Sequence, residues 1–268
     1  MPVRKDETGR RWVEMEILTP GTPEQVWEAF ATGPGYTAWF TKAEIDGKVG
    51  GSFRLDFGQG MTTSGEVTFW EPPHRFGYVE LGWAPGAPPC ATEITITARS
   101  GDRCVVRMVH SLFASTDDWD DQLEGFESGW PGFFAVLRTY LAHFAGQAAA
   151  SFFAMAPASG DLVSTWARLL AALGLAGANV GETTTAEGAP EALSGTVELI
   201  WQEAEKRGVL LRLDGPSPGI ALVGAFAKGG MVMASLCRYD YGDGAAARIA
   251  ECEPKWRAWL GGGFSDGG

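Results

Sequence analysis

The residue of this sequence best suited to chemistry is His110, in the run DRCVVRMVHSLF. If residues 100–102 turn a hairpin, antiparallel pairing places Thr92 opposite His110, on a face that also carries Met108. An imidazole there could orient a carbonyl or hydroxyl group of a ligand, or act as a general base. The alternative is a core histidine that hydrogen-bonds to Thr92 or Ser111. We favour this structural role, because a single histidine without a paired carboxylate makes a poor catalyst.

The acidic residues do not supply that carboxylate. Alternation along the predicted strands places four glutamates on the face opposite the apolar residues, where we expect a solvated outer surface. These are Glu14, Glu16, Glu66 and Glu93. A second acidic group precedes a predicted helix, where the helix dipole favours negative charge, and its spacing does not fit a calcium loop. It consists of Asp117, Asp118, Asp120 and Asp121.

The sequence contains no motif for a cofactor or a metal. GxSxG, Walker, HExxH and dinucleotide patterns are all absent. The four cysteines are scattered without a CxxC pair, which favours reduced thiols over a metal site or disulfides. They are Cys90, Cys104, Cys237 and Cys252. We therefore expect no cofactor and no metal.

The charge of the chain excludes two classes of partner. Its 268 residues carry 21 Lys and Arg against 33 Asp and Glu, a net charge of −12. Without a basic block, binding to a nucleic-acid backbone or an anionic membrane is not expected. No apolar run is long enough to span a bilayer, and the N-terminus lacks the apolar core of a signal peptide. These features favour a cytoplasmic location.

The order of elements predicts an α+β fold with an antiparallel sheet. Residues 11–18 alternate as a strand, and Thr22-Pro23-Glu24-Gln25 then opens a short helix as a capping box with proline at the first position. A second helical turn follows at 36–40. Residues 43–113 read as a meander of about six strands. Alternation places one set of apolar residues on a single face: Phe53, Leu55, Phe57, Val67 and Phe69.

A long helix closes this half, and its first part breaks the rules of helix composition. The segment EGFESGWPGFFAVLRTYLAHF carries Gly125, Gly129, Pro131 and Gly132 before an ordinary apolar stripe. We predict a kink or break near Gly129, with Ser128 as a cap for a new segment. In this interpretation the glycines leave space over the sheet, and Trp130 lies over the mouth of a cavity.

The second half repeats this order in a shorter form. Ser194-Gly195-Thr196-Val197 resembles Ser64-Gly65-Glu66-Val67, and Trp166 in a predicted helix corresponds to Trp27. The stretch before residue 194 is too short for all the preceding strands. The second half therefore reads as a degenerate copy that lacks roughly one hairpin.

Several of these segments together resemble a known family. TPEQVWEAF, GGSFRLDF, GEVTFWEPPHRFGYVEL, VVRMVHSLF and the closing helix are similar to the SRPBCC or START-like superfamily, in the branch named for the activator of heat-shock protein 90 ATPase. The resemblance covers residues 10–146 and implies a helix-grip fold, in which a curved antiparallel sheet wraps a long C-terminal helix. Residues 151–268 would form a truncated second domain of the same kind.

The resemblance implies a cavity between sheet and helix, where many relatives bind apolar small molecules. The alternation of the strands and the stripe of the helix point to the same place. We expect this ligand site to be lined by Trp39, Phe53, Phe57, Phe69, Tyr78, Ile94, Met108, His110, Trp130 and Phe134.

Three functions follow from the resemblance. The first is a binding protein without catalysis, in which His110 or Tyr78 orients an apolar ligand. The second is a cyclase- or hydrolase-like enzyme that uses His110 as acid and base. The third is a co-chaperone-like interaction module, and the sequence leaves a homo-oligomer or a protein partner open. The loop at 82–89, with Trp83, is a lid, a protein-contact patch or a plain rigid loop.

Overall fold

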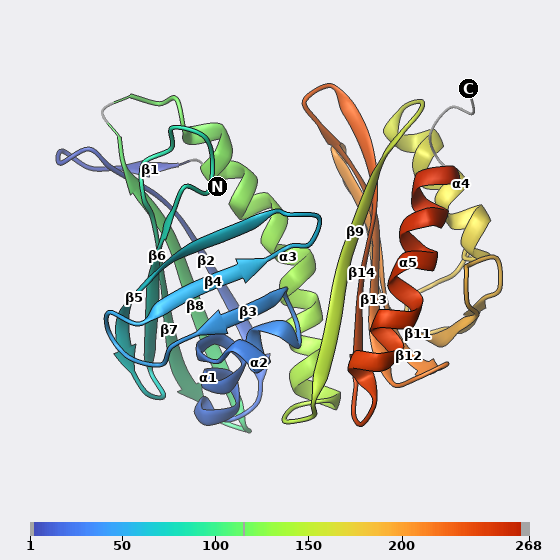
Figure 1. Ribbon diagram of the computed structural model, residues 1–268, viewed down its shortest axis with the longest axis horizontal. Coiled ribbons are helices and arrows are strands. Elements are labelled where there is room, and N and C mark those ends of the chain that lie inside the picture. The colour runs from blue at the N-terminus through green and yellow to red at the C-terminus, as the bar shows by residue number, and fades with distance from the viewer. Residues whose placement is uncertain (1–2, 115, 264–268) are drawn as a thin grey trace. The chain divides into compact units, whose positions relative to one another are not determined.

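The computed structural model describes residues 3–114 and 116–263 and divides into two compact units, Met1–Gly146 and Gln147–Gly268. Each unit is built from one antiparallel sheet, a short helix region after the first long strand, and a closing helix (Figure 1). The α+β class with a helix-grip arrangement, followed by a second copy, is therefore confirmed. Among the described residues, no helix is long and apolar enough to cross a membrane.

The first unit contains an eight-stranded sheet in the order β1-β2-β8-β7-β6-β5-β4-β3. Its helices are α1 (Pro23–Ala31), α2 (Gly33–Thr37) and α3 (Asp120–His143). Its strands are β1 (Arg4–Lys5), β2 (Arg10–Pro20), β3 (Lys42–Ile45), β4 (Ser52–Asp56), β5 (Thr62–Glu71), β6 (Arg75–Leu81), β7 (Cys90–Arg99) and β8 (Arg103–Phe113). The closing helix α3 packs chiefly on β2.

The second unit contains a six-stranded sheet in the order β10-β11-β12-β13-β14-β9. Its helices are α4 (Leu162–Leu173) and α5 (Ala245–Gly263). Its strands are β9 (Ala149–Ala158), β10 (Thr183–Ala186), β11 (Leu193–Gln202), β12 (Lys206–Gly215), β13 (Gly219–Lys228) and β14 (Met231–Tyr241). In its described part, the unit lacks counterparts of β1, β3 and α2, so it is shorter by two strands and one short helix, whereas the sequence predicted that roughly one hairpin is missing.

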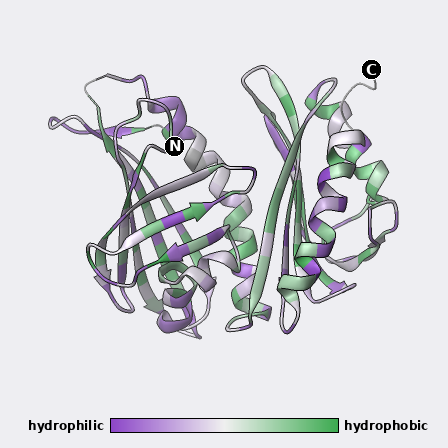
Figure 2. Cartoon of the chain, in the orientation of Figure 1, coloured by the Kyte–Doolittle hydropathy of each residue, from purple (hydrophilic) through white to green (hydrophobic). Residues whose placement is uncertain are grey.

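Local sequence rules account for the beginning of the fold. Thr22 accepts a hydrogen bond from the Gln25 backbone, and the Gln25 side chain bonds back to Thr22, which confirms the predicted capping box. The hairpin of β7 and β8 also has the predicted register, with Thr92 opposite His110. Along β4, hydrophilic and hydrophobic residues alternate, as expected of a strand with one buried face (Figure 2).

A β-bulge occurs at the same place in both units. The register of β5 shifts between Val67 and Phe69, and that of β11 shifts between Val197 and Leu199. In both units the valine at the bulge exchanges backbone hydrogen bonds with the loop that precedes its partner strand, β4 in the first unit and β10 in the second. In the first unit Gly50 donates to Val67 at 2.9 Å, and in the second Gly181 donates to Val197 at 2.8 Å. The shared irregularity supports the repeat more strongly than short sequence echoes do.

Helix α3 is continuous from Asp120 to His143, with Pro131 inside it, so the predicted break is wrong. The glycines do not open space over the sheet either. Gly125 and Gly129 are exposed, and a Cβ added at either position would meet nothing within 4 Å. Ser128 donates to the Gly125 carbonyl at 3.1 Å and does not cap a new segment. Because Trp130 is buried and anchors this part of the helix, packing overrides the poor local propensity.

Replacing either exposed glycine with alanine is expected to stabilise the protein. Gly125→Ala and Gly129→Ala each remove backbone freedom from the unfolded chain and should add about 1 kcal/mol to the free energy of unfolding, measured with urea. Gly65→Ala is the opposite control, because its Cβ would lie 1.7 Å from the Val79 carbonyl oxygen. A loss of stability in Gly129→Ala would contradict the exposed position of this residue.

Candidate functional site

A chain of polar side chains crosses the buried inner face of the first sheet. The Trp130 indole on α3 donates to His110 Nε2 on β8 at 2.7 Å, and His110 Nδ1 lies 2.8 Å from Thr92 Oγ1 on β7. An indole N–H can only donate, so His110 Nε2 must accept. The proton of the neutral ring is thereby assigned to Nδ1, which donates to Thr92. Of the two expected partners, Thr92 is the one confirmed.

Burial lowers the pKa of His110 to about 3, so the ring is neutral near neutral pH. With Nε2 accepting and Nδ1 donating, neither nitrogen is directed at a substrate. This geometry fits the structural role better than that of a general base. His110 instead links the closing helix to the sheet.

The row of hydrogen-bonded polar side chains continues through two buried tyrosines. The hydroxyl groups of Tyr36 on α2 and Tyr78 on β6 share a hydrogen bond of 3.1 Å. The Tyr78 ring stacks on Phe53 at 3.7 Å between centroids, and its hydroxyl also interacts with Thr92. Burial raises the pKa of both tyrosines, so both are uncharged near neutral pH. Polar contacts thus run from α2 across the sheet to α3.

Glu80 is a candidate residue that the sequence analysis missed. Alternation along β6 places Phe76, Tyr78 and Glu80 on the inner face, and this pattern in RFGYVEL could have identified it. The register sets Glu80 between Gly65 on β5 and Cys90 on β7, both of them small residues. Burial raises the pKa of Glu80 to about 7. A carboxyl group that titrates near neutral pH on an inner face is typical of functional sites.

Eight of the ten predicted site residues are buried in the first unit. They are Trp39, Phe53, Tyr78, Ile94, Met108, His110, Trp130 and Phe134. Phe57 is half-buried. Burial is what a packed core requires, so a role of these residues in binding stays a prediction.

The predicted inward position of Phe69 is wrong. The bulge between Val67 and Phe69 interrupts alternation, so Phe69 pairs with Gly77 on the outer face. There the Arg75 guanidinium lies 3.6 Å from the centre of the Phe69 ring and also bonds Glu93. Trp70 takes the inward position and packs edge-on against Trp27.

The outer face carries the expected carboxylates. Glu14 accepts from Arg107 at 2.7 Å and from Arg4 at 3.1 Å. These cations hold the pKa of Glu14 below its usual range, which fits a solvated ion pair and no chemistry.

One residue of the acidic run has a specific partner beyond the helix dipole. Asp120, in the first turn of α3, accepts two hydrogen bonds from Arg11, one of them 2.6 Å long. Arg11 is buried on β2, and its guanidinium lowers the pKa of Asp120. The start of α3 is therefore fixed to β2, the second strand of the sheet, by a bidentate ion pair.

The loop between β6 and β7 is folded back on the unit. The Trp83 indole donates to the Pro88 carbonyl at 2.8 Å, and its ring packs edge-on against Trp119 at 5.5 Å. Trp83 is half-buried beside a small apolar cluster of Val13, Leu112 and Leu123. This arrangement favours the rigid loop among the three roles considered.

Partly exposed aromatic rings surround Trp130. Phe40, after α2, stacks on Trp130 at 4.7 Å between centroids and contacts Phe133 edge-on at 4.8 Å. Phe57, after β4, lies 5.8 Å from Phe40. We call Phe40, Phe57 and Phe133, all half-buried, the aromatic rim. It joins three separate elements at an apolar surface over the buried polar chain.

The second unit has the same inner positions but different side chains. Its register sets Leu211, Leu213, Ala221 and Arg238 where the first unit has Tyr78, Glu80, Thr92 and His110.

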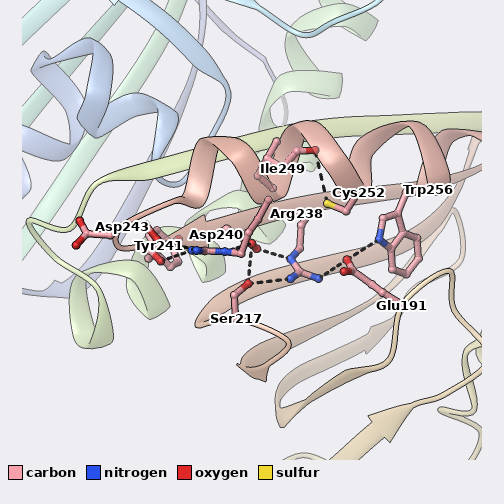
Figure 3. A network of polar contacts seen from close by, with 10 residues as sticks. Glu191, Ser217, Arg238, Asp240, Tyr241, Asp243, Ile249, Cys252 and Trp256 are labelled. Carbon is pink, nitrogen blue, oxygen red and sulfur yellow. Dashed lines mark hydrogen bonds and ion pairs between the residues drawn. The ribbon is translucent and has the colours of Figure 1, made fainter.

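Arg238 is almost fully buried and held by its own network (Figure 3). It donates to Asp240 at 2.7 Å, to Glu191 at 3.3 Å and to Ser217 at 3.4 Å. Trp256 on α5 completes the network by donating to Glu191 at 3.0 Å. These charges are paired with one another, as structural buried charges are.

A metal site is not indicated in either unit. No group of three or more His, Cys, Asp or Glu side chains within 3–114 and 116–263 is arranged to hold a metal ion. The four cysteines are buried free thiols, and burial raises their pKa.

The first unit is a helix-grip domain with a polar chain between its sheet and its closing helix. Residues 20–142 match the family described as activator of Hsp90 ATPase homolog 1-like protein. This stretch, a little under half of the chain, carries the resemblance to that family and to the SRPBCC or START-like superfamily.

Several solved structures are similar to the chain at low identity. CalU16 from Micromonospora echinospora is 22% identical, with 53% of this chain and 83% of that chain covered and a TM-score of 0.42. DynU16, a putative protein in the dynemicin biosynthetic locus, is 19% identical, with 85% and 86% covered and a TM-score of 0.43. The Aha1 dimer from Colwellia psychrerythraea is 21% identical, with 48% and 95% covered and a TM-score of 0.41. A search of curated proteins found no match.

Removing the indole N–H should uncouple α3 from the sheet. Trp130→Phe leaves His110 Nε2 buried without its donor and is expected to lower the free energy of unfolding by about 1–3 kcal/mol. A double-mutant cycle with His110→Leu should show coupling of about 1 kcal/mol or more. Trp12→Phe, on the outer face, is the matched control. If the two substitutions changed the free energy of unfolding additively, the proposed linkage between Trp130 and His110 would be contradicted.

Glu80 should make stability fall as pH rises. Its folded-state pKa of about 7 lies above its ordinary value of 4.5, so the folded protein holds this proton more tightly than the unfolded chain. Between about pH 4.5 and 7, ionisation should cost the wild type roughly 3 kcal/mol relative to Glu80→Gln. Urea unfolding across this range measures the difference, with Glu66→Gln as the exposed control. If the difference in the free energy of unfolding did not depend on pH, the raised pKa of this half-buried carboxyl would be contradicted.

Proposed function

We propose that the first unit binds an apolar small molecule between its sheet and α3, and that it acts as a binding protein without catalysis. The observation that carries this proposal is the aromatic rim. Half-buried Phe40 and Phe133 contact Trp130, with ring centroids 4.7 and 6.2 Å away, and Phe57 extends the group through a contact of 5.8 Å with Phe40. Partly exposed aromatic surface of this kind is stabilised when an apolar molecule covers it.

The polar chain under the rim supports selectivity in such a site. Binding sites for small molecules are largely apolar and carry a few placed polar groups that fix orientation. Tyr78, held by Tyr36 and by stacking on Phe53, is rigid enough for this role. His110 contributes by fixing Trp130 on α3.

The enzyme alternative has less support. A general base at His110 needs a free ring nitrogen and a pKa near the working pH. The ring instead has a hydrogen-bond partner on each nitrogen and a pKa of about 3. No contact of the described residues favours the co-chaperone-like module.

We also infer that residues 151–268 are a truncated second SRPBCC-like domain. The shared bulge and the common order of strands and helices support this assignment. Its Arg238 network and leucine-rich inner positions are typical of a packed interior. We place the ligand in the first unit because the aromatic rim lies there, although the second unit has a pocket beside Trp166 and Val209.

The aromatic rim provides the test. We expect the neutral fluorescent probe N-phenyl-1-naphthylamine to bind the protein and to quench part of its tryptophan fluorescence. Phe133→Ser should lower the affinity of the protein for the probe about tenfold, because one aromatic contact is lost. Phe113→Ser is the matched control, since Phe113 is 64% exposed.

Thermal melting should show that both variants remain folded. Equal affinity in the wild type and Phe133→Ser would exclude the rim as the binding surface. Native mass spectrometry of protein from its own host gives a second measurement, in which a co-purified apolar molecule is the expected result.

A further inference from the structure

The Glu80 carboxyl is not required by the fold. The pairing of Gly65 with Glu80 corresponds to the pairing of Gly195 with Leu213 in the second unit. Leu213 is buried in its core. The same position of the same sheet thus accepts a leucine, which would also avoid the cost of burying a carboxylate. The presence of Glu80 in the first unit needs another explanation.

A second polar group, the Thr63 hydroxyl, lies beside Glu80. Thr63, on β5, is buried, and its Oγ1 has no hydrogen-bond partner of ordinary length among the described residues. It lies near enough to Glu80 to oppose the rise of that carboxyl's pKa. The Thr63 hydroxyl can donate one hydrogen bond to the Glu80 carboxylate, which leaves other acceptor sites of the carboxylate and of the hydroxyl oxygen open to a further donor.

The groups around Glu80 supply no positive charge. Tyr78 on β6, Tyr36 on α2 and Cys90 on β7 lie near enough to interact with its charge, and burial raises the pKa of all three, so they are neutral. On β8, His110 is neutral as well.

The inner-face cation on β2, Arg11, is held by Asp120 of α3. On β4, Asp56 accepts a hydrogen bond from the Gly58 backbone. No ion pair of Glu80 with a Lys or Arg is found within the described ranges, 3–114 and 116–263.

We propose that Glu80 and Thr63 form a cradle for a protonated amine, so that the ligand is an apolar molecule carrying an ammonium group. This inference rests on the proposed function and names its ligand class. An ammonium has three N–H donors, which suit a carboxylate and a hydroxyl oxygen placed side by side. The apolar part of the ligand is covered by the aromatic rings, while its charge cancels that of Glu80.

This pairing makes binding depend on pH in one direction. The ammonium requires the ionised form of Glu80, so binding releases a proton whenever the free carboxyl is protonated. Affinity for an amine should rise as pH increases from about 5.5 to 8. Affinity for a neutral molecule of the same shape should stay constant.

The test compares 1-decylamine, 1-decanol and decanoate as competitors of N-phenyl-1-naphthylamine. At pH 8 the amine should bind about 10–100 times more tightly than the alcohol, as expected for a buried charge-assisted hydrogen bond. Glu80→Gln should abolish this preference, and Thr63→Val should reduce it. Glu66→Gln, an exposed carboxylate on the neighbouring part of β5, should leave it unchanged.

Each remaining outcome decides the matter. If the alcohol binds as tightly as the amine, the amine cradle is wrong while apolar binding stands. If decanoate binds best, Glu80 acts as a protonated donor and the proposal fails. If no competitor displaces the probe, the proposal fails as well, and if the probe itself does not bind, the proposed function fails with it. Should Glu80→Gln not fold, Glu80→Leu replaces it and should melt at a higher temperature without amine preference.

Discussion

The first unit depends on one buried hydrogen bond, from the Trp130 indole to His110. It joins the closing helix to the middle of the sheet, and it fixes the tautomer of the histidine. Because the donor is part of a large ring, the same residue anchors the aromatic rim and satisfies the polar chain beneath it. A single side chain thus provides both the apolar packing of the rim and the hydrogen bond that the buried histidine needs.

Most of the fold could be predicted from the sequence because its signals are local. Capping at Thr22, the register of the hairpin at His110 and the order of elements all follow from short patterns. The prediction for Phe69 failed where the period of two is interrupted by a bulge, which leaves no mark in a single strand's alternation.

The candidate site was less predictable than the fold. Glycines and a proline in α3 indicated an opening, whereas the buried Trp130 keeps the helix intact and the glycines face outward. Glu80 could have been predicted by the same alternation rule that identified Tyr78. Its neutral surroundings could not be predicted in this way, because only the placement of β5, β7 and α2 shows which groups lie around it. A sequence pattern can predict which face of the sheet a residue occupies. Which residues lie beside it on other strands is known only from the tertiary structure.

The two attachments of α3 differ in physical kind. Its first turn is held through the Arg11–Asp120 ion pair, which is partly accessible to solvent, and its middle is held by a neutral hydrogen bond in the core. Dissolved salt screens the first and leaves the second untouched. Ionic strength therefore acts more strongly on the beginning of this helix than on its middle, so the solution around the protein can weaken one attachment of α3 while the other keeps its strength.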